Sequence, residues 1–334
     1  MGRGKVINTM TTPEWIEQIN PKNTEFLNDF MEYCDTTKSD RTLYEYKCDL
    51  LVAFCWALNH IDNKVFTDWT KRDIQKYQNY LINDCHLSPA RVRRLKAVLS
   101  SLSNFIETIC DDDYPDFRNI VTKIPNPPLA PKLTKTVFTE DEVDDLLDYL
   151  TKHGKYCKAC LVALAAFSGR RKSELIQFKV SDFTDDTLVC NGALYKSAPM
   201  RTKGRGKQGK MLECYTLAKN FKPYLDNWMK YREEHGIESE WLFPSPINSE
   251  EHITRSSVDS WYDEFSLLGK PFYLHSLRHN FTTRLLKAGI PALVIKDLIG
   301  WSDVSIISTY NDTNKDEIFS KYFDQNGIKT IDET

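Results

Sequence analysis

Residues 275–310, HSLRHNFTTRLLKAGIPALVIKDLIGWSDVSIISTY, combine helical patterns with side chains that can bind and attack a phosphate. His275 and Arg278 stand at i and i+3, so they share one face of a helical turn. An arginine fork fits two phosphate oxygens, and a neighbouring imidazole can donate a further hydrogen bond or take a proton. The pair therefore predicts an anion-binding site. Trp301 and Tyr310 follow the apolar helix LVIKDLIG, and a tyrosine beside such cations can act as a nucleophile.

Two further basic stretches lie upstream of this region. In FSGRRKSELIQFKVSDF, Arg171 stands two positions after Gly169 and three before Glu174, on a predicted amphipathic helix. Arg170 could compete for the same role, but the spacing to Glu174 favours Arg171. Further on, the Lys/Gly-rich run RTKGRGKQGK predicts a β-turn that carries Lys203, Lys207 and Lys210.

The order of these motifs resembles a known family. The chain reads S-G-x-R-x-x-E-L, a lysine in a turn, H-x-L-R-H, glycine with tryptophan, and finally tyrosine, which resembles the tyrosine recombinases, or phage integrases, over its C-terminal three-fifths. The resemblance implies that Glu174 accompanies a catalytic set of Arg171, Lys207, His275, Arg278, Trp301 and the nucleophile Tyr310. Tryptophan rather than histidine at position 301 is similar to the Cre-like members. Arg170 and Lys172 depart from the pattern, because the family usually has apolar residues there. The turn offers three lysines, among which the K-x-G-K run favours Lys207.

Length and composition are compatible with a two-domain DNA enzyme. The 334 residues suffice for two cores, and 41% hydrophobic with 27% charged residues is ordinary for a globular protein. A net charge of −3 and a pI near 6.2 do not by themselves indicate nucleic-acid binding. The charge is patterned, however: residues 170–172 and 201–210 are basic, whereas 111–113, 140–148 and 182–186 are acidic. The local potential decides where phosphate binds.

Several classes of site and location are disfavoured. The nine cysteines are expected to be reduced core residues, and the single C-x-x-C at Cys157 and Cys160 lacks a second pair at zinc-finger spacing. We therefore expect no metal and no other cofactor. The chain has no apolar run of transmembrane length and no signal-peptide segment, which predicts a cytoplasmic protein acting on cellular DNA without a membrane partner.

Helical patterns and a proline-rich break predict the domain organisation. Residues 12–109 carry repeated helical patterns, beginning with Thr12 before Pro13, and residues 111–135 are rich in proline and lack a period. We expect a helical, SAM-like core-binding domain over 1–112, a linker over 113–135 and a catalytic domain over 136–334. The fold is expected to be mainly α with a small antiparallel sheet, whose strands at Thr187–Cys190 and Met211–Thr216 flank the basic turn, and a C-terminal helix over Asp316–Phe323. The resemblance implies that the two domains close around DNA as a clamp.

A basic cluster opens the helical pattern that follows Pro89. It could be a solvated helix face or a support for the DNA backbone, and the resemblance favours the second reading. The residues expected to touch DNA are Arg91, Arg93, Arg94, Lys96, Lys132, Lys135, Lys203 and Arg205. Because few residues precede Thr12, we expect simple inverted repeats to be recognised without a separate arm-type site.

The chemistry that remains is metal-free transesterification. A metal-dependent nuclease needs clustered carboxylates, and a nucleotide-driven enzyme needs a phosphate-binding loop of the form G-x-x-x-x-G-K-[ST]; neither accompanies these motifs. The resemblance implies a site-specific recombinase that forms a 3′-phosphotyrosine and passes through a Holliday junction in a homotetramer on inverted repeats. Integration, excision and resolution all fit. The alternatives are a DNA-binding regulator with an integrase-like fold, a type IB topoisomerase and a telomere resolvase.

Overall fold

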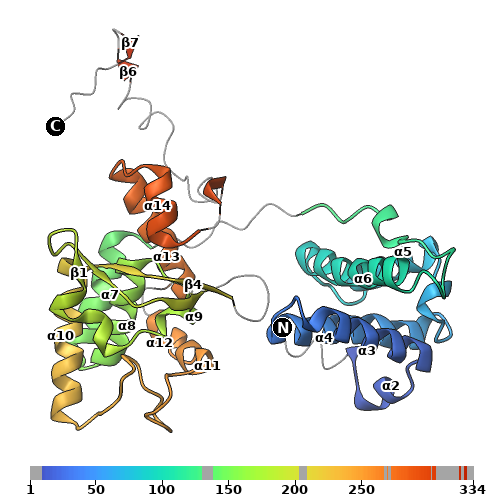
Figure 1. The fold of residues 1–334 in the computed structure, drawn as a ribbon, viewed down its shortest axis with the longest axis horizontal. Coiled ribbons are helices and arrows are strands. Elements are labelled where there is room, and N and C mark those ends of the chain that lie inside the picture. The colour runs from blue at the N-terminus through green and yellow to red at the C-terminus, as the bar shows by residue number, and fades with distance from the viewer. Residues whose placement is uncertain are drawn as a thin grey trace. The chain divides into compact units, whose positions relative to one another are not determined.

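The computed structural model describes residues 10–129, 138–202, 209–266, 269, 272–301 and 303–305, with two short strands, Phe323–Asp324 and Gly327–Ile328. The described residues form two compact units, one within 10–129 and the other within 138–202 and 210–305 (Figure 1). Within the described residues, no helix is both long and apolar enough to cross a membrane.

The first unit is a bundle of helices whose starts are marked by capping side chains. Thr12, Ser39 and Ser88 each accept a hydrogen bond from a backbone N–H of the first turn, which satisfies a donor that the helix itself cannot. The expected start at Thr12 is confirmed. The α-helices are α2 (Pro13–Glu17), α3 (Pro21–Asp35), α4 (Asp40–His60), α5 (Lys71–Asn83) and α6 (Pro89–Ile109), with 3₁₀ turns at Phe66–Asp68 and Val121–Lys123.

The core of the first unit lies between α3, α4, α5 and α6. Trp56 packs against Trp69 and Tyr77, with ring centroids 5.6 and 5.1 Å away. Val121 is buried in the same core, and Phe117 and Ile124 pack against it. The expected linker covers residues 113–135. Its first half therefore packs on the first unit, because its apolar side chains contact the hydrophobic core there.

The second unit is built around one buried helix. Nearly every side chain of α8 is buried, and α7, α10 and α13 pack against it (Figure 1). Thr139 and Glu142 form a capping box at the start of α7. The α-helices are α7 (Glu140–Lys152), α8 (Tyr156–Ser168), α9 (Lys172–Leu175), α10 (Ala218–Glu234), α11 (Arg255–Asp259), α12 (Tyr262–Phe265), α13 (Leu274–Lys287) and α14 (Ala292–Ile299).

Two small antiparallel sheets accompany these helices. The strands β1 (Leu188–Val189), β2 (Leu194–Lys196) and β5 (Tyr215–Leu217) lie in the order β1-β2-β5, and β3 (Met200–Thr202) pairs with β4 (Lys210–Leu212). The expected antiparallel arrangement is confirmed, but two details were wrong. The strand directly before the basic turn is β3, not Thr187–Cys190, and the expected strand Met211–Thr216 is divided between β4 and β5. Strands of two or three residues are too short to give a period-of-two signal.

Two other expected helices differ from the structure or lie largely outside it. The helical pattern of SSVDSWYDEFSLLG, residues 256–269, predicts one helix, but the structure has two separate short helices in this region, α11 and α12. The expected helix over Asp316–Phe323 lies outside the described residues except for Phe323, which begins β6 (Phe323–Asp324) opposite β7 (Gly327–Ile328).

Candidate active site

Arg171 lies at the corner between α8 and α9. Gly169 ends α8 with φ of +61°, and an added Cβ there would come within 2.5 Å of the Phe281 ring, so only glycine fits. Arg171 is then the N-cap of α9, a helix of four residues, and not part of the longer amphipathic helix that the sequence predicts. Its backbone N–H and its Nη1 donate to the two carboxylate oxygens of Glu174 at 3.0 and 2.9 Å. Glu174 is fully buried, whereas the Arg171 side chain is 30% exposed, so the carboxylate orients an arginine that solvent can reach.

Arg278 approaches the same corner from α13. Its Nη1 donates to the carbonyl oxygen of Gly169 at 2.8 Å, and its side chain is buried. The Trp301 ring lies under the guanidinium, with its centroid 5.6 Å from Cζ. Because Gly169 stands two residues before Arg171, this contact holds the two arginines at one corner. His275, one turn earlier on α13, is exposed.

Trp301 follows directly after α14 and lies in a small hydrophobic cluster. Its ring is 3% exposed and packs with Phe281, Leu285, Ile295 and Ile299. The Trp301 ring thus contacts the Arg278 guanidinium and also fills part of this hydrophobic cluster. His279, also on α13, is buried, with Nδ1 at 3.5 Å from the Thr283 hydroxyl.

Arg170 and Arg171 point to different environments. Arg170 is 1% exposed, and its guanidinium donates to the carbonyl oxygens of Leu298 and Ile299 at 2.8 and 3.2 Å. Both Nη atoms of Arg170 are thus occupied by carbonyl oxygens at the end of α14, whereas the Arg171 side chain is 30% exposed. Arg171 therefore remains the phosphate-binding candidate, in agreement with its spacing to Glu174.

Most of the remaining sequence-predicted site residues lie outside the residues that the structure describes. Lys210 begins β4 and is exposed. The residues outside the described ranges are Lys132, Lys135, Lys203, Arg205, Lys207 and Tyr310. The motif contains Gly169 and Gly300, but the sequence did not show that the Gly169 carbonyl anchors Arg278 or that Gly300 ends α14. Glycine directly after each apolar helical run was the signal that could have found them.

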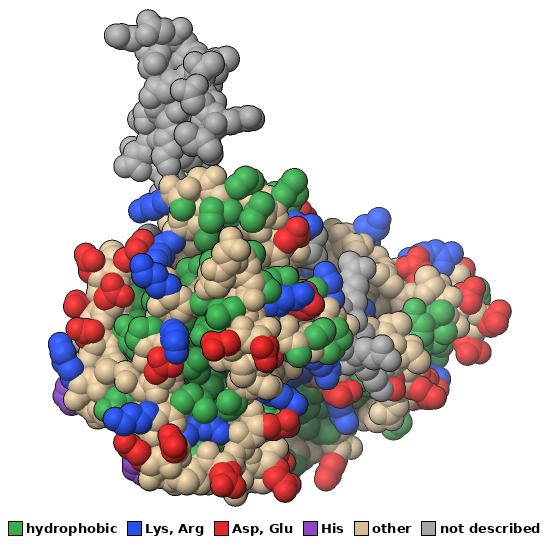
Figure 2. All heavy atoms as spheres, turned by 60° about the vertical axis from the view of Figure 1, so that its left-hand side comes forward, with side chains coloured by type: hydrophobic (Ala, Val, Ile, Leu, Met, Phe, Trp, Pro, Cys, Tyr) green, Lys and Arg blue, Asp and Glu red, His purple; other side chains and the backbone are tan. Residues whose placement is uncertain are grey.

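The basic cluster of the first unit is paired with carboxylates on α4. Arg91 donates to both carboxylate oxygens of Asp49, at 2.6 and 3.0 Å, and Arg94 contacts Glu45 at 2.6 Å and Asp49 at 3.3 Å. Arg93 donates through Nε to the carbonyl oxygen of Pro127 at 2.8 Å. These arginines remain partly exposed, and their charge is partly offset by the acidic partners. On the face drawn in Figure 2, acidic and basic side chains are likewise interspersed.

Lys96 differs from the other members of that cluster. It is 3% exposed, and its ammonium donates to Gln78 Oε1 at 2.7 Å and to the carbonyl oxygens of Ile124 and Pro125 at 2.9 and 3.3 Å. Burial lowers the pKa of Lys96. The expected DNA contact at Lys96 is therefore corrected to a structural role, in which the ammonium fastens the segment after α6 onto the bundle.

Lys96→Met is expected to destabilise the first unit without changing the ionic part of DNA binding. The variant keeps the apolar stem but leaves three acceptors without their charged donor, and a hydrogen bond to a charged group contributes about 1.5–3 kcal/mol. Arg94→Met removes an exposed arginine and should cost at most about 1 kcal/mol. Urea denaturation of the full chain measures the first effect. The salt dependence of DNA binding measures the ionic contribution, and we expect Lys96→Met to leave the slope of log K against log salt concentration unchanged. A slope reduced by about one in Lys96→Met would instead place this ammonium on a phosphate.

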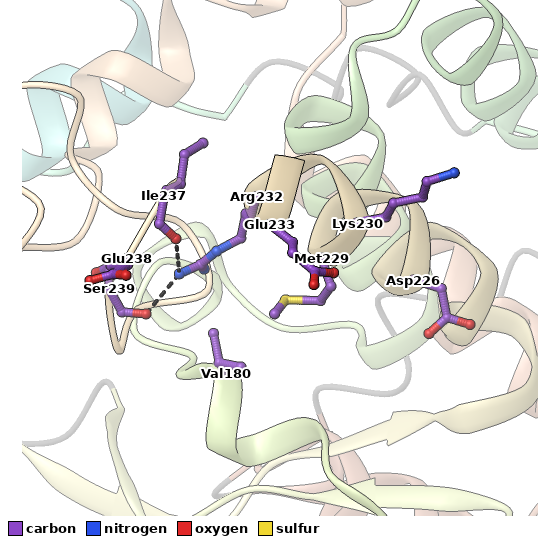
Figure 3. Close-up of a pocket in the computed structure, with 9 residues that line it drawn as sticks. All are labelled: Val180, Asp226, Met229, Lys230, Arg232, Glu233, Ile237, Glu238 and Ser239. Atoms are coloured by element: carbon purple, nitrogen blue, oxygen red, sulfur yellow. Dashed lines mark hydrogen bonds between the residues drawn. The ribbon is translucent and has the colours of Figure 1, made fainter. Parts of the chain in front are cut away.

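A hollow of about 700 Å³ lies at the end of α10, and Arg171, Arg278 and Trp301 are not among the residues that line it. Figure 3 shows Arg232 between α10 and the following loop, donating to the carbonyl oxygens of Ile237 and Ser239. Arg232 is buried and also donates to the carbonyl oxygens of Trp241 and Leu242. Arg232 thus holds the loop after α10 against that helix. The residues that line the hollow include none of the proposed catalytic groups.

Family models and known relatives match both units of this chain. The phage integrase family model matches residues 136–317, and the model of the phage integrase N-terminal SAM-like domain matches residues 26–116. The SPbeta prophage-derived recombinase-like protein YomM of Bacillus subtilis is 28% identical over 288 residues, covering 83% of this chain and 82% of YomM. A tyrosine recombinase of Pseudothermotoga lettingae is 26% identical over 292 residues, covering 85% of this chain and 92% of the relative.

Solved structures show the same fold. XerH recombinase bound to difH substrate, in a pre-cleavage complex, matches with a TM-score of 0.64 at 16% identity, over 90% of this chain and 96% of that chain. A lambda integrase dimer bound to a COC′ core site matches with a TM-score of 0.62 at 18% identity, over 86% and 77%. Since the integrase family model alone spans more than half of the sequence, the chain belongs to the phage integrase family of tyrosine recombinases.

Proposed function

We propose that this protein is a site-specific DNA recombinase that cleaves and rejoins strands through a covalent 3′-phosphotyrosine. The observation that carries the proposal is the convergence of Arg171 and Arg278 on the corner at Gly169, although they stand more than a hundred positions apart in the sequence. Two guanidinium groups held by buried partners can bind the non-bridging oxygens of one phosphate. Such preorganised cations stabilise charge that develops in a transition state.

In the proposed reaction, the Tyr310 hydroxyl oxygen attacks the scissile phosphorus. A new P–O bond to Tyr310 forms as the bond to the 5′ oxygen breaks, and Lys207 gives that oxygen a proton. His275, exposed beside Arg278, can take the phenol proton. Arg171, Arg278 and His275 hold the pentacoordinate phosphorane, and Trp301 supports the cradle. Because the phosphotyrosine ester retains the bond energy, a 5′-hydroxyl of another strand can reverse the step without metal or ATP.

The proposed substrate is double-stranded DNA with inverted-repeat sites. Two rounds of strand exchange pass through a Holliday junction within a homotetramer. The domain over 1–112 and the catalytic domain over 136–334 close on the duplex, joined by residues 113–135. Arg91, Arg93 and Arg94 rest on the backbone, together with Lys132, Lys135, Lys203 and Arg205. The place of action is the DNA of the nucleoid or of a host cell.

Recombination between two DNA sites distinguishes the proposed recombinase from a topoisomerase and from a regulator that only binds DNA. We expect purified protein in EDTA to convert a supercoiled plasmid with two directly repeated copies of the DNA flanking its gene into two circles. Agarose gels followed by junction sequencing measure the products. A type IB topoisomerase would relax plasmids with or without the sites, and a non-recombining regulator would bind them and leave them intact. Either result would contradict the proposal.

A further inference from the structure

Arg170 occupies a position where the resembled family usually carries an apolar residue, and its environment shows what the guanidinium does. The side chain is enclosed between the end of α14 and the segment after β4. Nη2 donates to the carbonyl oxygen of Leu298 at 2.8 Å and, more weakly, to that of Glu213 at 3.4 Å. Nη1 donates to the carbonyl oxygen of Ile299 at 3.2 Å.

These acceptors belong to the end of a helix that needs partners. The last carbonyl groups of a helix have no intrahelical donor, and a cation there also complements the helix dipole. Gly300 takes φ of +74°, and the N–H groups of Gly300 and Trp301 both donate to the Lys296 carbonyl oxygen at 2.9 Å. Arg170 therefore completes the last turn of α14 directly before Trp301.

The same residues form a closed circuit of contacts. Trp301 lies under the Arg278 guanidinium, Arg278 donates to the Gly169 carbonyl oxygen, and Gly169 is bonded to Arg170. Arg170 in turn holds the carbonyl groups that precede Trp301. An apolar side chain at position 170 could fill the space but could not donate to Leu298 and Ile299.

We infer that Arg170 is a positioning residue for DNA cleavage. Its guanidinium fixes the end of α14 against the corner that carries Arg171, and so sets the place of Trp301. Arg170 does not touch the phosphate, because backbone carbonyl oxygens surround it. The inference deepens the proposed function and rests on it.

The first test replaces Arg170 and separates binding from cleavage. With saturating protein on a nicked suicide substrate, Arg170→Met is expected to form the Tyr310 adduct about 10²-fold more slowly, as for a misplacement of about 1 Å. The Kd for the same DNA should change less than about twofold, because no DNA contact is lost. Arg170→Lys keeps one charged donor, so its cleavage rate should lie between that of wild type and that of Arg170→Met. A cleavage rate equal to wild type in Arg170→Met would overturn the inference.

The second test reaches the same contact from the other side. An added Cβ at Gly300 would lie 2.9 Å from Arg170 Nη1 and 3.1 Å from Leu212 Cδ1, whereas at Gly289, with φ of +77°, it would meet nothing within 4 Å. Gly300→Ala and Gly289→Ala thus share the backbone cost, and only the first displaces the guanidinium. We expect Gly300→Ala alone to slow cleavage, and to slow it less in the Arg170→Met background. Equal defects in the two alanine variants, or an unchanged defect in the double variant, would overturn the inference.

A measurement without DNA separates failure of the inference from failure of the proposed function. Hydrogen exchange at the amides of Gly300 and Trp301 should be at least about tenfold faster in Arg170→Met, with the amides of α8 unchanged. Unchanged exchange at these two amides would contradict the positioning role. Absence of the adduct in wild-type protein would contradict the proposed function instead, and the amide measurement would still decide whether Arg170 holds the end of α14.

Discussion

Arg171→Ala is expected to slow covalent cleavage by at least about 10²–10³-fold, the usual cost of removing one preorganised donor from a developing charge. The variant should still bind its DNA site, because the other backbone contacts persist and one phosphate contact contributes only part of the affinity. Stability must be measured beside cleavage, because Arg171→Ala also leaves the buried Glu174 carboxylate without its Nη1 donor. Single-turnover cleavage of a suicide substrate and a parallel binding titration measure the two quantities separately.

Lys172→Ala is the matched control for Arg171→Ala. It removes one positive charge from the next residue, but the Lys172 ammonium pairs with Asp259 and lies over the Tyr262 ring, with Nζ 5.7 Å from its centroid. We expect near-normal cleavage from this variant. Similar losses in Lys172→Ala and Arg171→Ala would mean that net charge, and not a phosphate contact by Arg171, is responsible.

Arg278→Ala should also abolish cleavage, but it removes a buried side chain, so stability must be measured beside it.

Local hydrogen bonding made much of the fold predictable. Thr12, Ser88 and Thr139 begin helices because their side chains accept first-turn N–H groups, a relation that spans only three residues. The ends of α8 and α14 are equally local, because glycine follows each apolar run and takes the left-handed conformation.

Contacts between distant segments were beyond the sequence. Arg170 and Arg171 are identical neighbours, but segments far along the chain, among them α14 nearly 130 positions later, bury Arg170 and leave Arg171 partly exposed. Lys96 reads as one of several cations at a helix start, yet it is enclosed by a segment about thirty residues downstream. The pairing of β2 with β5 is similarly non-local. For the proposed site, the sequence motif identified Arg171 and Arg278, and the structure supplied the Gly169 carbonyl oxygen that joins them.

Tyr310→Phe is expected to abolish strand cleavage while leaving DNA binding unchanged. Phenylalanine keeps the ring but lacks the hydroxyl oxygen that must bond to phosphorus, so no covalent intermediate can form at this position. The loss should exceed that of any single cation, because the cations lower a barrier whereas the hydroxyl is a reactant. Wild-type affinity in the variant is the control that shows an intact protein.

The most direct test of this account is a covalent adduct on nicked duplex carrying the DNA that flanks the gene, in EDTA. After denaturing electrophoresis, wild-type protein should give a band of protein joined to the labelled strand through its 3′ phosphate, and Tyr310→Phe should give none. A band of equal intensity from Tyr310→Phe, or no wild-type band on DNA that the protein demonstrably binds, would contradict cleavage by Tyr310.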